Sequence, residues 1–80
     1  MMRIDKIEQM VYALDLVIDR YIKCKMNPGT INSLLNEIYS FYHDILQPYC
    51  GHSMSTIIIR NELIANLGDA QADVVYNQLF

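Results

Sequence analysis

Two histidines and two cysteines are the side chains of this sequence best suited to binding a metal ion. His43, Cys50 and His52 lie in one stretch, and Cys24 lies elsewhere in the chain. Neutral imidazole and thiolate groups are good zinc ligands, but zinc sites usually show paired spacings such as Cys-x-x-Cys or His-x-x-x-His. Neither spacing occurs here. We therefore expect no metal site and interpret the cysteines as reduced thiols.

Nucleophilic and acid–base catalysis have equally little support in the sequence. Cys50 and His52 are too close in the chain to imply a shaped cleft, and no residue can be named as an orienting acid or an oxyanion donor. The acidic residues follow the pattern of solvated helix faces, so no pair of carboxylates is set apart by its environment. The three scattered glycines form no phosphate-binding loop. The sequence therefore predicts a protein that is not an enzyme and that carries no cofactor.

The distribution of charge argues against a nucleic-acid partner. Residues 1–30 hold five basic and four acidic side chains, whereas residues 31–80 hold only Arg60 against five acids. Binding to phosphates needs a cluster of lysine and arginine. The one such cluster is Arg20, Lys23 and Lys25, which lies where a helix should end and would face the negative end of its dipole. The acidic C-terminal half suits a basic protein partner instead.

Composition places the chain among small globular domains with a large apolar content. Hydrophobic residues make up 52% of the sequence and charged residues 19%, against about 25% charged in average soluble domains. No apolar run reaches the roughly 18 residues of a membrane span, and the N-terminus does not resemble a signal peptide. We expect one cytoplasmic domain over residues 1–80. Either a well-filled core or a surface covered by a partner or a second copy would account for the apolar content.

Regular spacing of apolar residues predicts the first two helices. In the first, over residues 4–25, alternate steps of three and four connect Ile4, Ile7, Val11, Leu14, Ile18 and Tyr21. Asn27-Pro28-Gly29 should stop this helix and reverse the chain, because proline lacks the amide hydrogen and glycine allows a tight turn. A second helix, capped by Thr30, is expected over residues 31–46. Its buried face comprises Ile31, Leu34, Leu35, Ile38, Phe41, Tyr42 and Ile45.

Two glycine-containing stretches separate the remaining helices. Gln47-Pro48-Tyr49-Cys50-Gly51 is expected to end the second helix, after which His52 or Ser53 can cap a third over residues 53–67. Residues 55–59 are rich in β-branched side chains and could form a strand in isolation, but no second strand is available to pair with them. Gly68 suits the end of the third helix, and Asp69 can cap a final helix through Leu79. The sequence therefore predicts an all-α fold, a small antiparallel helical bundle of three long helices plus a short C-terminal helix.

Tyrosines and acids gather around the end of the second expected helix. Tyr39, Tyr42 and Tyr49 lie there together with Glu37 and Asp44. Tyrosine offers a large contact area at a low entropic cost, so it is enriched in protein interfaces. The rings could instead fill the small core, and Tyr42 does fall on the core face whereas Tyr39 does not. We predict these five residues as the partner-binding residues of an aromatic and acidic face.

Gly51-His52-Ser53-Met54 resembles the site of peptidyl carrier proteins, in which the serine bears a 4'-phosphopantetheine arm. Asp44 lies where those proteins often keep an acid, Gly68 follows at the spacing that ends their recognition helix, and Leu79-Phe80 is similar to their next motif. The resemblance implies modification of Ser53 and a role in thioester-bound biosynthesis. The segment before Ser53 departs from the family, because it is expected to be helical where carriers have a long loop. A helix cap is the simpler role for Ser53.

A second resemblance is to small helical bacteriocin-immunity proteins. It rests on Pro28-Gly29 ahead of residues 31–39, and on Glu62-Leu63-Ile64 followed by Asn66-Leu67. The resemblance implies a cytoplasmic helical bundle that protects its host by engaging a protein target. Our hypothesis is a non-enzymatic interaction protein that binds and neutralises or regulates a partner, as immunity proteins, antitoxins and phage inhibitors of defence systems do. The alternatives are the carrier protein and a structural homodimer whose first helix supplies the contact.

Overall fold

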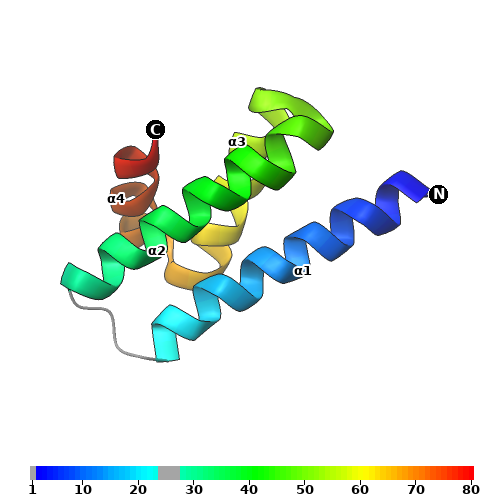
Figure 1. Cartoon of the computed structure of the whole chain (residues 1–80). Coiled ribbons are helices and arrows are strands. Elements are labelled where there is room, and N and C mark those ends of the chain that lie inside the picture. The colour runs from blue at the N-terminus through cyan, green and yellow to red at the C-terminus, as the bar shows by residue number, and fades with distance from the viewer. Residues whose placement is uncertain (1, 24–27) are drawn as a thin grey trace.

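The computed structural model describes residues 2–23 and 28–80, and every element in them is a helix (Figure 1). The elements are α1 (Met2–Lys23), α2 (Pro28–Phe41), the π-helical turn η1 (Tyr42–Leu46), α3 (Gln47–Leu67) and α4 (Asp69–Leu79). The all-α prediction is confirmed for this part of the chain. Within it, none of the helices combines the length and the apolar character that a bilayer crossing requires.

The core is built from side chains of all four helices and of η1. α2 lies alongside α1 (Figure 1), and the last turn of α4 lies beside the second half of α2. α3 packs against both α1 and α4. Pairs of apolar residues four apart turn one face of each long helix inward. The largest fully buried apolar side chains are Leu14, Ile18, Leu34, Ile38, Leu46, Ile59, Leu63 and Val75.

The connection between α1 and α2 differs from the predicted one. α2 begins at Pro28, so Pro28 and Gly29 belong to the helix and not to the turn. Proline is favoured at the first helical position, because the amide hydrogen there has no partner within the helix. Thr30 lies inside α2 and is therefore not its cap. Asn27, like Cys24 and Lys25, lies outside the described residues.

Pro48 does not end the second helix, contrary to the prediction, because η1 precedes it. The backbone amide of Gln47 donates to the carbonyl of Tyr42, five residues earlier. In a regular α-helix the proline ring would clash with the carbonyl four residues before it. A wider π turn is one of the ways in which a helix accommodates such an interruption. The helix consequently runs on through Pro48 and bends only at Gly51.

The π turn also changes which side chain is buried. A continuous α-helical period places Ile45 in the core, as predicted, but Ile45 is 43% exposed and Leu46 is fully buried. A π turn holds more residues than an α turn, so it rotates the following residues by about one position. The prediction for Ile45 was wrong for this reason, and its side chain lies at the surface between η1 and α1.

Gly51 and Gly68 form the two bends in the C-terminal half. Their φ and ψ angles are 83° and 170° for Gly51, and 85° and 164° for Gly68. This backbone region is essentially restricted to glycine. Gly68 takes the cap position of α4 that the prediction assigned to Asp69. Gly51 likewise takes the position before the second part of α3, which the prediction assigned to His52 or Ser53.

Residues 55–59 are helical throughout. Ser55 and Ile59 are fully buried, whereas Ile57 is 55% exposed. The buried Ser55 hydroxyl donates to the carbonyl of Gly51 four residues earlier, which satisfies both polar groups at the bend. The prediction of a helix for this β-branched stretch is confirmed.

Candidate functional site

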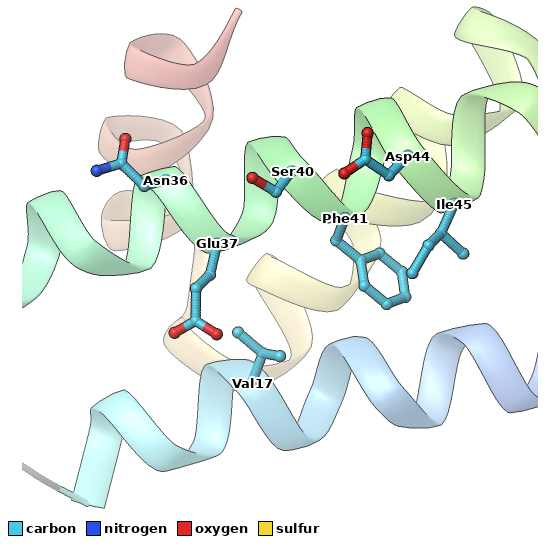
Figure 2. Close-up of a pocket in the computed structure, with 7 residues that line it drawn as sticks. All are labelled: Val17, Asn36, Glu37, Ser40, Phe41, Asp44 and Ile45. Carbon is cyan, nitrogen blue, oxygen red and sulfur yellow. The ribbon is translucent and has the colours of Figure 1, made fainter.

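A hollow of about 350 Å³ opens between α1 and the chain of α2 and η1 (Figure 2). We call it the α1–α2 hollow. Figure 2 shows Phe41 and Ile45 pointing toward α1, whose Val17 faces back. The seven lining residues are Val17, Asn36, Glu37, Ser40, Phe41, Asp44 and Ile45. The hollow therefore has an apolar floor contributed by two helices.

Helical spacing produces a polar edge beside this floor. Asn36, Ser40 and Asp44 are four residues apart and lie along the side of α2 and η1 that is turned away from α1 (Figure 2). Phe41 and Ile45 are also four apart and form a parallel apolar row. Side chains at this spacing share a helix face. The two rows present an apolar surface that is polar along one side.

Glu37 joins α2 to α1 at one end of the hollow. Nη2 of Arg20 donates to its Oε1 atom at 2.8 Å, and the hydroxyl of Tyr21 donates to its Oε2 atom. The Arg20 and Glu37 side chains are 58% and 41% exposed, so the ion pair contributes only about 0.2–1 kcal/mol. Glu37 was predicted to bind a partner, but its carboxylate already serves the α1–α2 contact. A substitution of Glu37 would therefore change the α1–α2 contact as well as any partner binding.

Asp44 places an exposed carboxylate at the other end of the hollow. Its side chain is 70% exposed, and its Oδ1 atom lies 3.0 Å from Nδ1 of His43. The sequence holds no lysine or arginine between residues 26 and 59. Because Arg20 offsets the charge of Glu37, Asp44 carries the acidic character of this surface.

A second hollow, of about 440 Å³, lies at the bend of α3. Its lining residues are Ile7, Tyr49, Cys50, Gly51 and Met54. Tyr49, which was predicted to bind a partner, follows Ile45 by four residues and is 42% exposed. It lies about one turn further along the helix, in a hollow that Ile7 of α1 also lines.

Cys50 and His52 form hydrogen bonds to different partners. The thiol of Cys50 donates to the carbonyl of Leu46, 3.2 Å away, whereas Nδ1 of His52 lies 2.7 Å from the hydroxyl of Tyr42. Within residues 2–23 and 28–80, no three histidine, cysteine, aspartate or glutamate side chains are grouped as a metal would need.

Tyr39 and Tyr42 belong to a different surface, beside the end of α4. The Tyr42 ring is 7% exposed and packs edge-on against Phe80, with 5.1 Å between the ring centroids. Tyr39 is 47% exposed and lies 5.7 Å from Tyr42 between centroids. On this aromatic surface, Tyr39 and Phe80 are exposed, and the buried Tyr42 ring packs against both of them. No local pattern points to Phe80, because its ring contact joins residues 42 and 80, which are far apart in the chain.

Ser53 is exposed in the first turn after Gly51. Its carbonyl accepts a hydrogen bond from the Thr56 hydroxyl at 2.9 Å. The chain is helical through Cys50, immediately before the bend. Ser53 thus has the exposure that a modified serine needs, but a helix stands where carrier proteins have a long loop.

Glu62 corrects the prediction that no carboxylate pair is set apart by its environment. It lies on α3 opposite Asp15 of α1, and Nδ2 of Asn66 donates both to Oδ1 of Asp15 at 3.1 Å and to the carbonyl of Glu62 at 2.8 Å. Burial, followed by the hydrogen bond and the negative charge of Asp15, raises the pKa of Glu62 from 4.5 to about 7. Neutral Glu62 is therefore favoured by folding.

Stability is expected to fall as the pH rises through this range. The contribution of neutral Glu62 is complete below pH 4.5, its unfolded pKa, and is lost as the pH passes its folded pKa of about 7. Glu62→Gln keeps an uncharged side chain at every pH. The variant should therefore be as stable as the wild type at pH 4.5 and more stable than the wild type at pH 8. Since water screens this partly exposed pair, we expect a gain below about 1 kcal/mol, or a few degrees in Tm.

Thermal unfolding followed by circular dichroism at the two pH values measures this difference. Glu8→Gln, at an exposed position of α1, is the matched control and should change neither value. A Glu62→Gln variant that has the same Tm as the wild type at both pH values would contradict the raised pKa.

Comparison with models of protein families, with curated proteins and with solved structures gives no match for this chain.

Proposed function

We propose that this chain is a non-enzymatic protein-interaction module that binds and neutralises or regulates a partner protein. Immunity proteins, antitoxins and phage inhibitors of defence systems act in this way. The proposal treats the fold as a small antiparallel bundle that offers the α1–α2 hollow as its binding surface. The observation that carries it is the position of Ile45, an aliphatic side chain turned out of the core and onto an open apolar floor.

The exposure of other large apolar side chains supports the same proposal. Among the described residues, those at least 38% exposed are Tyr12, Leu16, Ile22, Tyr39, Ile45, Tyr49, Met54, Ile57, Val74 and Phe80. Exposed apolar residues are ordinary when they are scattered, but a cluster around a hollow is typical of an interaction site. Ile45, Tyr49 and Met54 form such a cluster, because they line or border two hollows.

Binding at this surface would act by occlusion. Apolar contacts to Phe41 and Ile45 would supply the affinity, since each Å² of apolar surface removed from water contributes about 25 cal/mol. The exposed carboxylate of Asp44 would steer a basic target and favour one orientation. A partner whose own working surface is covered in this way would be inactive while bound.

Ile45→Asp is expected to abolish partner binding without unfolding the chain. A charge on the apolar floor would have to be desolvated on binding, whereas in the free protein it remains in water. Val74→Asp is the matched control, because Val74 is an exposed aliphatic residue on α4, 54% exposed. Val74→Asp should change stability by less than about 0.5 kcal/mol, whereas Ile45→Asp, at a half-buried position, should cost about 0.5–3 kcal/mol, which is less than the stability of a small domain.

Affinity capture from the native host, read by quantitative mass spectrometry, compares the two variants with the wild type. The expected result is a protein retained by the wild type and by Val74→Asp but lost with Ile45→Asp. If all three forms retain the same proteins in equal amounts, the proposed surface is wrong.

A further inference from the structure

The apolar floor has the dimensions of a helix-binding groove. From Phe41 and Ile45 of this floor to Tyr49 of the second hollow the chain advances eight residues, or at most roughly 12 Å at the α-helical rise of 1.5 Å per residue. A helix packed along it would contact it over two to three turns, through residues spaced three and four apart. An extended segment has no such template, because the described backbone is helical and presents no strand edge to pair with.

The charges around the floor specify the polar side of that helix. Asn36 and Ser40 can both donate and accept hydrogen bonds, but an ionised Asp44 can only accept them. The charge of Glu37 is offset by Arg20 at 2.8 Å, whereas the 70% exposed Asp44 has only a histidine beside it. A lysine or arginine of the partner would match Asp44, and an acid at the same place would be repelled.

A second copy of this chain is poorly equipped to supply that cation. Of the described lysine and arginine side chains, Arg20 pairs with Glu37, Lys23 with Asp19 at 3.0 Å and Arg60 with Asp73 at 2.9 Å, which leaves the exposed Lys6 as the one cation without an ion pair. The three ion pairs would have to open before these residues could meet Asp44. The arrangement favours a different protein as the occupant.

We propose that the α1–α2 hollow binds a basic amphipathic helix of two to three turns. This inference rests on the proposed function and names the chemistry of its partner. Apolar side chains of the helix pack on Val17, Phe41 and Ile45, and a lysine or arginine on its flank meets Asp44.

Three synthetic peptides of 14 residues test this proposal. They share one leucine stripe at helical spacing and carry lysine, glutamine or glutamate on the flank. Fluorescence anisotropy at low salt is expected to rank them lysine over glutamine over glutamate, with the lysine peptide at least about three-fold tighter than the glutamine one. Added salt should remove this advantage, because exposed charges are screened. In a ¹⁵N-labelled chain, the amide shifts should gather at Val17, Phe41, Ile45 and Tyr49.

Asp44→Asn separates a local effect from an effect of net charge. This substitution should weaken binding of the lysine peptide by about two- to five-fold and leave binding of the glutamine peptide unchanged. Asp69→Asn changes the net charge equally at an exposed position of α4, and it should alter neither affinity.

The inference is overturned if the lysine and glutamate peptides bind alike, if Asp69→Asn matches the effect of Asp44→Asn, or if the shifts map to α4. Sedimentation that shows a dimer for the wild type and a monomer for Ile45→Asp would assign the hollow to a second copy and would also overturn it. A capture result that depends on Ile45, combined with no preference among the peptides, leaves the proposed function standing and removes only the basic helix. If capture does not depend on Ile45 but the lysine peptide is preferred, the proposed function is removed and the basic helix stands.

Discussion

Ile59→Ala is expected to lower the free energy of unfolding by about 2–5 kcal/mol, whereas Ile57→Ala changes it by less than about 0.5 kcal/mol. Ile59 is fully buried and Ile57 is 55% exposed. The larger loss would remove much of the stability of a small domain, which is about 5–15 kcal/mol in total. Urea unfolding followed by circular dichroism measures both values.

The two isoleucines form a matched pair, because they share a residue type and a helix. In a strand, residues two apart point to the same face, whereas in a helix they point to nearly opposite sides. Equal losses at the two positions would contradict the helical assignment of this β-branched stretch.

Gly68→Ala is expected to destabilise the chain by about 1–3 kcal/mol, because its backbone angles suit glycine alone. A Cβ atom at Gly68 would meet nothing within 4 Å, so the loss arises from the backbone and not from a clash. Gly68→Asn should lose as much stability as Gly68→Ala. Asparagine tolerates the left-handed helical region, with ψ near 47°, but ψ of Gly68 is 164°.

Thermal or urea unfolding of the two variants, beside Gln71→Ala as a control on the exposed face of α4, measures this effect. The control should stay within about 0.5 kcal/mol of the wild type. If asparagine restores stability relative to alanine, Gly68 adopts a left-handed helical turn and the bend described above is wrong.

Much of the fold could be predicted from local patterns. The three-and-four spacing in α1 depends on neighbouring residues only, and Gly51 and Gly68 mark bends that other residues rarely form. Pro48 shows the limit of such patterns. Proline usually ends a helix, but here η1 adjusts the backbone ahead of it, and the helix continues.

The candidate site could be predicted only in part. Glu37 and Asp44 line the α1–α2 hollow, and Tyr49 lines the next one; their role in binding stays a prediction. Ile45 and Phe41 were assigned to the core, because a regular helical period puts them there. Tyr39 and Tyr42 lie on the aromatic surface. His43 connects this surface to Asp44, because its ring stacks on Tyr39 with 6.3 Å between the ring centroids and its Nδ1 atom lies 3.0 Å from Oδ1 of Asp44.

The sequence by itself determined the all-α class, the inward faces of the helices outside η1 and the positions of the glycine bends. These properties arise from hydrogen bonding and conformational preference over a few neighbouring residues. The tertiary structure decided that Ile45 faces a hollow, that Phe80 covers Tyr42, and that burial together with Asp15 raises the pKa of Glu62. Exposure, ring packing and the pKa of a carboxyl depend on side chains brought together from distant parts of the chain, which no local pattern records.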